Sequence, residues 1–351
     1  MDVSQLFLYI GVIIISTGVV WVGSFFLESA AEGLSEHYQL PPVVQGGVVL
    51  AVGSSFPELS TTVLSTVIHG KFELGVAAIF GSAIFNILVI PGICGLVSKE
   101  LGFNDNKDFI YRDVQFQITS IAVLLITFAG AVLYNPVPNA MWQGKVNRWI
   151  VLIPLSLYGL YLFLQQQSTE LHKAQPKKED EVNQDTKGKE SGDISIVQEW
   201  LKLLFSLVLI VASVEGLVWG TIGLGEVLNT PSFLWGITII AAATSLPDAF
   251  VSIRAAQNND SIISLSNVLG SNIFDLLVAI PVGILIAGAS IVDFAITVPM
   301  MGASILATIA LFVMLLRKFD LSYNESILLL VMYGAFVAWM VSETFGITNV
   351  I

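Results

Sequence analysis

The chain has 351 residues, of which 55% are hydrophobic and only 12% are charged. This balance excludes a soluble globular domain and is typical of a polytopic membrane protein. The formal net charge of -12 argues against nucleic acid as a partner, because nucleic-acid-binding surfaces are basic. Cys94 is the single cysteine, so no disulfide can form within the chain.

Ten apolar segments are long enough to span a membrane, which takes about 20 apolar residues per helix. In chain order they are residues 4–27, 42–67, 73–98, 113–135, 148–165, 199–221, 231–256, 261–289, 293–316 and 323–344. The polar stretch 166–198 separates the first five from the last five and is predicted to be a flexible linker. The chain therefore divides into a five-helix unit at 1–165, the linker, and a second five-helix unit at 199–351.

The basic residues orient these predicted helices. If the N-terminus lies outside, only three basic residues fall on the outer side, namely Lys71, Lys145 and Arg148. The inner side then holds Lys99, Lys107, Arg112, Lys173, Lys177, Lys178, Lys187, Lys189, Lys202, Arg254, Arg317 and Lys318. The positive-inside rule therefore predicts a cytoplasmic linker and both termini outside, and we expect the protein in the plasma membrane. Since each unit has an odd number of spans, the units enter the membrane in opposite directions, which predicts an all-α protein of two inverted five-helix repeats.

Two short patterns occur once in each unit, inside predicted spans. Gly53-Ser-Ser-Phe-Pro-Glu58 in the second span is repeated as Ala243-Thr-Ser-Leu-Pro-Asp248 in the seventh. Gly81-Ser-Ala-Ile-Phe-Asn86 in the third span is repeated as Gly270-Ser-Asn-Ile-Phe-Asp275 in the eighth. Carboxylates are costly in hydrocarbon and are normally buried against a partner or an ion path. Acids at matching places in two repeats therefore point to a transported cation.

Each pattern brings several oxygen atoms to one helix face. A proline has no N–H, so Pro57 and Pro247 leave the carbonyl groups of Gly53 and Ala243 without their usual helical donors. Hydroxyl groups three and four residues before each acid share its face. The candidate side chains are Ser54, Ser55, Glu58, Ser82 and Asn86 in the first unit, and Thr244, Ser245, Asp248, Ser271 and Asp275 in the second. Oxygen ligands without His or Cys suit a hard cation such as Ca²⁺.

Structural explanations exist for some of these residues. Ser55 and Glu58 also match a capping box, in which the serine and the acid satisfy the first turn of a helix. The Gly-Ser pairs at Ser82 and Ser271 equally fit close helix packing, and Asn86 can form an interhelical hydrogen bond. Acids near the ends of the first and sixth spans are expected to be solvated: Glu28, Glu32, Glu36, Glu215 and Glu226. The three histidines, His37, His69 and His172, are expected at the surface.

With both patterns in place, the chain resembles the sodium/calcium exchangers of the calcium/cation antiporter superfamily, over roughly 43–92 and 233–283. Their hallmark is a pair of inverted repeats with Gly-Thr/Ser-Ser-x-Pro-Glu/Asp and Gly-Ser-Asn-x-Phe-Asn/Asp. The resemblance implies alternating access, with the first and sixth helices sliding past a fixed core. It further implies Ca²⁺ at Glu58 and Asp248, and Na⁺ at Glu58, Ser55, Ser82, Asp248, Ser245 and Ser271, with Ser54, Thr244, Asn86, Asp275 and the two free carbonyls completing the sites.

The first unit departs from the family pattern by having fewer amides. Ala78 and Ala83 stand where the second unit has Asn267 and Asn272. Asp248, in place of the commoner Glu, resembles the potassium-dependent branch, where an acid is also found at the position of Asp275. The linker is too short for the calcium-sensing domains of animal exchangers.

The resulting interpretation is an antiporter that exchanges Na⁺ for Ca²⁺ and normally extrudes Ca²⁺, functional as a monomer. A Walker-type nucleotide motif is absent from the sequence, so we expect no enzyme activity and no cofactor, and the ion gradient supplies the work. A proton/Ca²⁺ antiporter and a potassium-dependent exchanger use the same carboxylates and stay open as alternatives. A cation channel is a more remote alternative, because inverted repeats with broken helices are typical of transporters.

Overall fold

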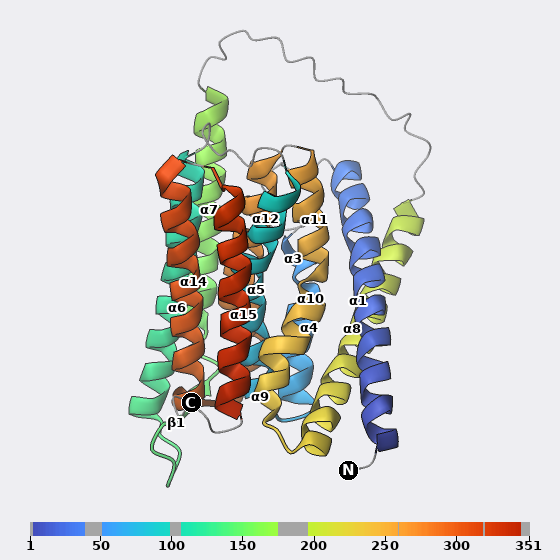
Figure 1. Cartoon of the computed structure of the whole chain (residues 1–351), viewed down its shortest axis with the longest axis vertical. Helices are drawn as coiled ribbons and strands as arrows, with labels where there is room; N and C mark the ends of the chain where they lie inside the picture. The colour runs from blue at the N-terminus through green and yellow to red at the C-terminus, as the bar shows by residue number, and fades with distance from the viewer. Residues whose placement is uncertain are drawn as a thin grey trace.

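The computed structural model describes residues 3–38, 51–98, 107–174, 196–258, 260–318 and 320–344. They form a bundle of long, roughly parallel helices (Figure 1). The elements are α1 (Val3–His37), α3 (Ala51–Ser54), α4 (Phe56–Val67), α5 (Phe72–Val97), α6 (Lys107–Tyr134), β1 (Gln143–Asn147), α7 (Leu152–Ala174), α8 (Ile196–Leu228), α9 (Ser232–Trp235), η2 (Gly236–Ile240), α10 (Ala241–Thr244), α11 (Leu246–Gln257), α12 (Ser261–Phe274), η3 (Asp275–Ala279), α13 (Ile280–Ala287), β2 (Ala289–Asp293), α14 (Phe294–Lys318) and α15 (Tyr323–Thr344).

The helical, polytopic character predicted from composition is confirmed. Seven helices of the described chain are long and apolar enough to cross a membrane, or eight if the bent pair Ser232–Thr244 and Leu246–Gln257 forms one span. Helical residues overlap each of the ten predicted segments, although residues 42–50 of the second segment lie outside the described residues. That ten helices cross the membrane as two inverted repeats stays a prediction.

Two short strands depart from the all-α prediction. β1 and β2 pair antiparallel, with Gln143 opposite Asp293 and Asn147 opposite Ala289. They come from the connections α6–α7 and α13–α14, which the fold brings to one end of the bundle. Backbone N–H and C=O groups need partners wherever they leave a helix, and pairing the two connections satisfies them.

Helices also extend beyond the predicted apolar limits. α7 continues to Ala174 and α8 begins at Ile196, so 166–174 and 196–198 are helical and the linker prediction was wrong there. The remainder of the predicted linker, 175–195, lies outside the described residues. α1 likewise runs to His37, ten residues past its predicted end. Gln, Glu, Lys and Ala are good helix formers, so these helices continue where the apolar pattern stops.

The two proline-containing patterns interrupt their helices. Ser55 separates α3 from α4, and Ser245 separates α10 from α11, where the helix axis bends by 45°. The next helix restarts at once, because the N–H groups of Leu59 and Ala249 donate to the carbonyls of Ser55 and Ser245 at 3.1 Å and 3.0 Å. Each proline lies in a first turn, where its missing N–H costs nothing.

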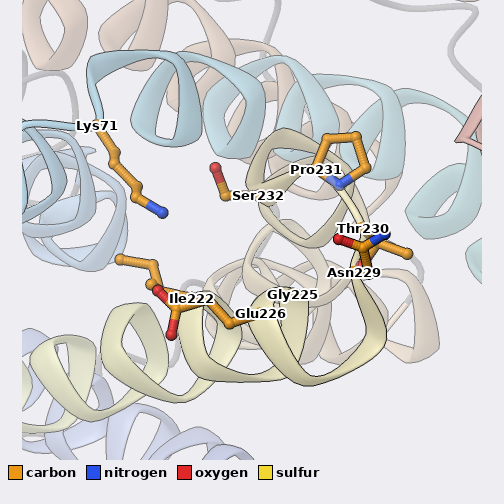
Figure 2. Close-up of a pocket in the computed structure, with 8 residues that line it drawn as sticks. All are labelled: Lys71, Ile222, Gly225, Glu226, Asn229, Thr230, Pro231 and Ser232. Carbon is orange, nitrogen blue, oxygen red and sulfur yellow. The ribbon is translucent and has the colours of Figure 1, made fainter.

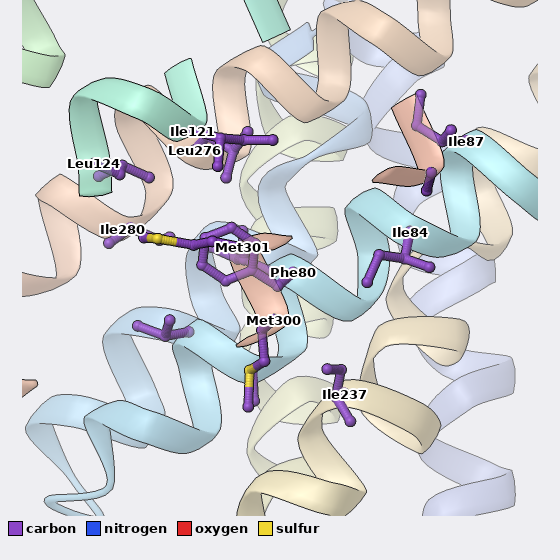
Figure 3. Close-up of a cluster of buried hydrophobic side chains, with 14 of the residues drawn as sticks. Phe80, Ile84, Ile87, Ile121, Leu124, Ile237, Leu276, Ile280, Met300 and Met301 are labelled. Carbon is purple, nitrogen blue, oxygen red and sulfur yellow. The ribbon is translucent and has the colours of Figure 1, made fainter. Parts of the chain in front are cut away.

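α5 is the central helix of the bundle. It packs against α4, α11, α14, α15 and η2, and most of its residues are buried. Figure 3 shows Phe80 of α5 among large side chains from the surrounding helices, including Ile237, Leu276 and Met300. α1 and α8 lie together at one side (Figure 1) and pack mainly on each other. We call the end of the bundle where α7 ends and α8 begins the linker end; α1 ends there as well.

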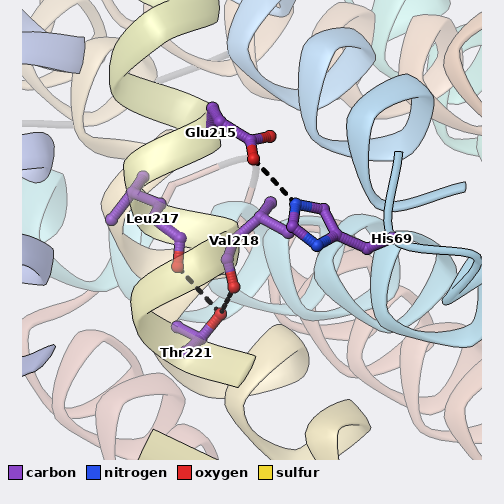
Figure 4. Close-up of polar contacts among 5 residues, drawn as sticks. All are labelled: His69, Glu215, Leu217, Val218 and Thr221. Carbon is purple, nitrogen blue, oxygen red and sulfur yellow. Dashed lines mark hydrogen bonds and ion pairs between the residues drawn. The ribbon is translucent and has the colours of Figure 1, made fainter. Parts of the chain in front are cut away.

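One contact links α8 to the connection between α4 and α5, near the end opposite the linker end. His69 Nε2 lies 2.8 Å from Glu215 Oε1, and the His69 side chain is only 17% exposed (Figure 4). His69, expected at the surface, is thus mostly buried, while Glu215, expected to be solvated, has a side chain that is 36% exposed and contacts His69. The fold places the short α4–α5 connection beside α8, so two residues that look like exposed ends in the sequence become partners.

Gly81 marks a close approach between the backbones of the two units. A Cβ atom at Gly81 would collide with the carbonyl oxygen of Ile237 and would lie 2.6 Å from the Cβ atom of Ala241. The backbones of α5 and η2 therefore touch, as small residues permit in membrane bundles. The packing interpretation of the first Gly-Ser pair thus holds for its glycine.

Gly81→Ala should destabilise the bundle by about 1–3 kcal/mol, because an overpacked helix contact forces the backbones apart. Gly334→Ala is the matched control, since a Cβ atom there meets nothing within 4 Å. Thermal unfolding in detergent, followed by loss of the monodisperse elution peak, measures both variants. Equal stability of the two would contradict the close contact.

Candidate functional site

The four segments that carry the repeated patterns meet inside the bundle. α3 packs against α12, α4 against η3, and α5 against α10, α11 and α12. The breaks at Ser55 and Ser245 lie beside α5 and α12, at neither end of the bundle (Figure 1). The structure thus brings residues separated by more than 160 positions into one polar cluster.

All ten predicted side chains are buried. Glu58 is 2% exposed, and Asp248 and Asp275 are 0% exposed. The hydroxyl and amide residues are buried to the same degree: Ser54, Ser55, Ser82, Asn86, Thr244, Ser245 and Ser271. An acid in such surroundings is stable only with compensation from hydrogen bonds or a counter-charge.

Asp248 is held by hydrogen bonds from both units. Ser271 Oγ donates to its Oδ1 at 3.0 Å, and Asn86 Nδ2 donates to its Oδ2 at 3.2 Å. The hydroxyls of Ser54 and Ser271 lie 3.3 Å apart, which extends the network to α3. Asp248 is therefore an oriented carboxylate whose position depends on α3, α5 and α12 together.

Further polar contacts join the two units around this acid. The hydroxyls of Ser82 and Ser245 are 2.7 Å apart. Asn86 Nδ2 also donates to Asn272 Oδ1 at 3.1 Å, and Asn272 Nδ2 donates to the carbonyl of Ala83 at 3.3 Å. Hydrogen bonding between helices, the structural explanation offered for Asn86, is thus present together with its contact to Asp248.

Two amides belong to the cluster although sequence reasoning did not select them as site residues. Asn267 Nδ2 donates to the backbone carbonyl of Asp248 at 3.3 Å and to Ser252 Oγ at 3.1 Å. Asn272, described above, lies fully buried between the units. The available signal was their position within and just before the second pattern, where the first unit has alanines.

The other two acids lack the bonds that Asp248 makes. Within the described chain, both carboxylate oxygens of Glu58 and both of Asp275 are buried without a hydrogen-bond partner. Ser55 Oγ and Asn86 Oδ1 are in the same condition. Glu58 interacts electrostatically with Asp275 and Asp248, and Ser55 lies beside Asp275. An unsatisfied buried polar group costs about 1–3 kcal/mol, and more if charged, so these oxygens are suited to a ligand.

The capping-box explanation does not account for Glu58. Neither Ser55 nor Ser245 makes a side-chain capping hydrogen bond at the start of the following helix. Thr244 Oγ1 donates to the carbonyl of Ile240 at 3.1 Å, as helical threonines often do. The acid and hydroxyl of the first pattern are therefore not used to cap α4.

The donor set is composed of oxygen atoms, which a hard cation prefers. Within the described residues, no group of three His, Cys, Asp or Glu side chains is placed to hold one metal ion. A cation here would therefore combine one or two acids with hydroxyl, amide and carbonyl oxygens. Such a mixed set fits Na⁺ and Ca²⁺ better than a transition metal.

A surface pocket lies elsewhere, at the end of the bundle opposite the linker end. It has a volume of about 370 Å³ and is lined by Lys71, Ile222, Gly225, Glu226, Asn229, Thr230, Pro231 and Ser232 (Figure 2). None of the predicted site residues lines it. The candidate site is the buried cluster between the units, and Glu226 is an exposed residue as predicted.

Solved structures and curated relatives resemble the chain over most of its length. The sodium-calcium exchanger NCX_Mj, soaked with Na⁺ and Sr²⁺, has the same fold with a TM-score of 0.60, at 22% identity, over 95% of this chain and 98% of that one. An uncharacterized membrane protein of Methanocaldococcus jannaschii is 26% identical, over 80% of this chain and 82% of its own. The putative antiporter CaxA of Alkalimonas amylolytica is 25% identical, over 90% and 91%.

A more distant relative has a longer chain. Sodium/potassium/calcium exchanger 5 of Homo sapiens is 25% identical, and the match covers 72% of this chain and 65% of that protein. The family model described as sodium/calcium exchanger protein matches residues 8–166 and 199–342, which include both patterns and both helical units. The chain therefore belongs to the sodium/calcium exchanger protein family.

Proposed function

We propose that the protein is a secondary antiporter that exchanges Na⁺ for Ca²⁺ by alternating access and normally extrudes Ca²⁺. The observation that supports this most is the buried oxygen cluster, in which Glu58 and Asp275 lack hydrogen-bond partners. Membership of a family of sodium/calcium exchangers supports the same two ions. The gradient of one ion supplies the work for the other, because moving one net charge is worth about 2.3 kcal/mol per 100 mV.

In this proposal Ca²⁺ is bound between Glu58 and Asp248, one acid from each unit. Na⁺ ions use the same acids with Ser55, Ser82, Ser245 and Ser271, and the carbonyls of Gly53 and Ala243 add backbone oxygens. Ser54, Thr244, Asn86 and Asp275 complete the sites. Asp248 is already oriented by Ser271 and Asn86, so a cation meets one preformed carboxylate and one unbonded carboxylate.

The same cluster explains how exchange is coupled. Two or three ionised acids in an apolar bundle repel each other and lack solvation. Binding of either Na⁺ or Ca²⁺ relieves this repulsion. Without a bound ion, the acids would stay charged and unpaired while the protein switches between its two access states, which makes that switch unfavourable. Ca²⁺ and Na⁺ therefore compete for one set of oxygens, and each crossing needs one of them bound.

A second candidate is potassium-dependent exchange. Asp275 has two unbonded, fully buried carboxylate oxygens beside Ser55, which is more negative charge than one Ca²⁺ site at Glu58 and Asp248 needs. The human relative at 25% identity is named a sodium/potassium/calcium exchanger. In potassium-dependent exchange, Asp275 would hold an additional monovalent cation.

The arrangement in the membrane is part of the proposal. Ten spans in two inverted repeats follow from the ten apolar segments, five in each unit, and the distribution of Lys and Arg puts both termini outside and the linker in the cytoplasm. In Figure 1, α7 ends and α8 begins at one end of the bundle, and β1 lies at the other, which agrees with that orientation. We place the protein in the plasma membrane, working as a monomer.

Neutralising either central acid should abolish exchange without unfolding the protein. Glu58→Gln and Asp248→Asn should each reduce sodium-driven ⁴⁵Ca²⁺ uptake by about 100-fold or more, as expected for the loss of about 3 kcal/mol of buried charge pairing. Glu226→Gln removes an exposed acid remote from the cluster and should transport normally. Elution of each variant as a single peak in detergent controls for folding. Sodium-driven uptake retained by Glu58→Gln would refute the assigned role.

The driving ion can be identified with separate gradients. Proteoliposomes loaded with Na⁺ and diluted into choline buffer should take up Ca²⁺ rapidly. Vesicles with only a pH gradient should take up no more than protein-free vesicles. Uptake driven by the pH gradient alone would favour the proton antiporter, and Ca²⁺ flux without any counter-ion would favour a channel.

The potassium dependence rests on one residue. If the second candidate holds, external K⁺ should stimulate Na⁺-driven Ca²⁺ exchange in the wild type, and Asp275→Asn should abolish the stimulation while exchange without K⁺ continues. Exchange that does not respond to K⁺ in the wild type would exclude this candidate and leave Asp275 to a Na⁺ or Ca²⁺ site.

A further inference from the structure

Glu28 of α1 lies against the broken helix of the first unit. A Cβ atom added at Gly53 would meet Glu28 Cγ at 3.7 Å and Glu28 Cα at 3.9 Å, so α1 crosses α3 at this glycine. Both distances are ordinary van der Waals contacts, so Glu28 lies directly against the first pattern. The expectation that Glu28 is a solvated residue beyond the end of its helix was therefore wrong.

The Glu28 carboxylate is partly buried and interacts electrostatically with the cluster. Its Oε1 atom is buried without a hydrogen-bond partner among the described residues, and Glu28 interacts electrostatically with Asp248 and with Glu32. Glu58, five residues after Gly53, is 2% exposed with both oxygens unbonded. Glu28 on α1 and Glu58 in the cluster thus each have a buried carboxylate oxygen without a hydrogen-bond partner among the described residues.

Nearby positive charge does not neutralise Glu28. Lys202 of α8 is the basic side chain on the facing helix, and its Nζ donates to Ser29 Oγ at 2.6 Å and lies 3.8 Å from Glu199. The ion pairs found among the described residues do not include Glu28. A buried acid is normally paired with a base or with a metal ion.

Three acids form a sequence of steps from the linker end to the site. Glu32 is exposed, one helical turn after Glu28 on the same face of α1. Glu28 is half-buried, and Asp248 is fully buried. Because α1 ends at the linker end, the three acids become more buried in order from that end toward the cluster.

We propose that Glu28 binds the transported cation on its way between the linker end and Asp248, with Glu32 as the outer step. The inference rests on the proposed cation exchange and adds a residue outside the two repeated patterns. Because α1 packs mainly on α8 and only lightly on α3, α4, α10 and α11, Glu28 sits on the pair of helices that can move relative to the cluster. It would then serve access from the linker end and not from the opposite end.

Cysteine accessibility tests this placement without relying on transport. In a Cys94→Ala background, which has no other cysteine, Glu28→Cys should react with a charged, membrane-impermeant thiol reagent added from the linker side, and Ca²⁺ should slow the reaction. Phe25→Cys is the matched control on the same helix, because Phe25 is 59% exposed on the outer surface of the bundle and should stay unreactive in lipid. An unreactive Glu28→Cys, or a reaction that Ca²⁺ does not slow, would overturn the proposal.

Transport from each side supplies the second readout. Glu28→Gln should raise the half-saturating Ca²⁺ concentration on the linker side by about fivefold or more, as for loss of a neighbouring unit charge even with strong screening, and leave the value on the opposite side unchanged. Glu28→Asp should restore it, and Glu226→Gln should match the wild type. Equal half-saturation in Glu28→Gln and wild type would reject the role of Glu28.

The two experiments separate this inference from the proposed function. If the wild type shows no sodium-driven Ca²⁺ flux, the proposed exchange fails, whereas Ca²⁺-sensitive labelling of Glu28→Cys still establishes a cation path past α1. If the wild type exchanges normally and the labelling is absent, only the role of Glu28 fails.

Discussion

The structure depends on the cost of holding carboxylates inside an apolar bundle. Asp248 is stabilised from within the protein, since Ser271 and Asn86 donate to its two oxygens. Glu58 and Asp275 receive no such bonds in the described chain. The cluster thus contains one acid whose orientation is set by the fold and two acids whose oxygens need another partner. A site that exchanges one cation for another requires this combination of a fixed ligand and ligands that adapt to different ions.

The breaks in the helices and the tight packing of α5 follow from that cost. Ser55 and Ser245 interrupt two helices beside α5, and backbone that leaves the helical pattern at membrane depth is tolerated only where it is buried or lines a cavity. Gly81 brings α5 against η2 so closely that Ser82 reaches Ser245. The contact between the units is therefore made by the same residues that form the site.

Much of the site could be predicted because polar residues are conspicuous in apolar segments and the patterns occur twice. All ten predicted side chains are buried in one region, although their ion contacts stay a prediction.

Other features had no such signal in the sequence. The apolar pattern ends before α1 does, so Glu28 and Glu32 looked like residues beyond a helix end. The pairing of His69 with Glu215, and of β1 with β2, depends on contacts between segments far apart in the chain, which no local pattern records. Asn267 and Asn272 were visible as departures from the first unit, but their bonds to Asp248 and Ala83 required the packing of α12 on α5 and α11.

Those two amides have a thermodynamic consequence. In the proposed exchanger with inverted repeats, two units with identical side chains would give states open to either side of the membrane that are mirror images with equal free energy. Asn267 bonds to Asp248 of its own unit and Asn272 bonds to the carbonyl of Ala83 in the first, while Ala78 and Ala83 have no side-chain amide to make matching bonds. In the proposed alternating-access cycle, the two orientations would therefore differ in individual hydrogen bonds, and we expect one of them to be favoured even when the ion concentrations on the two sides are the same.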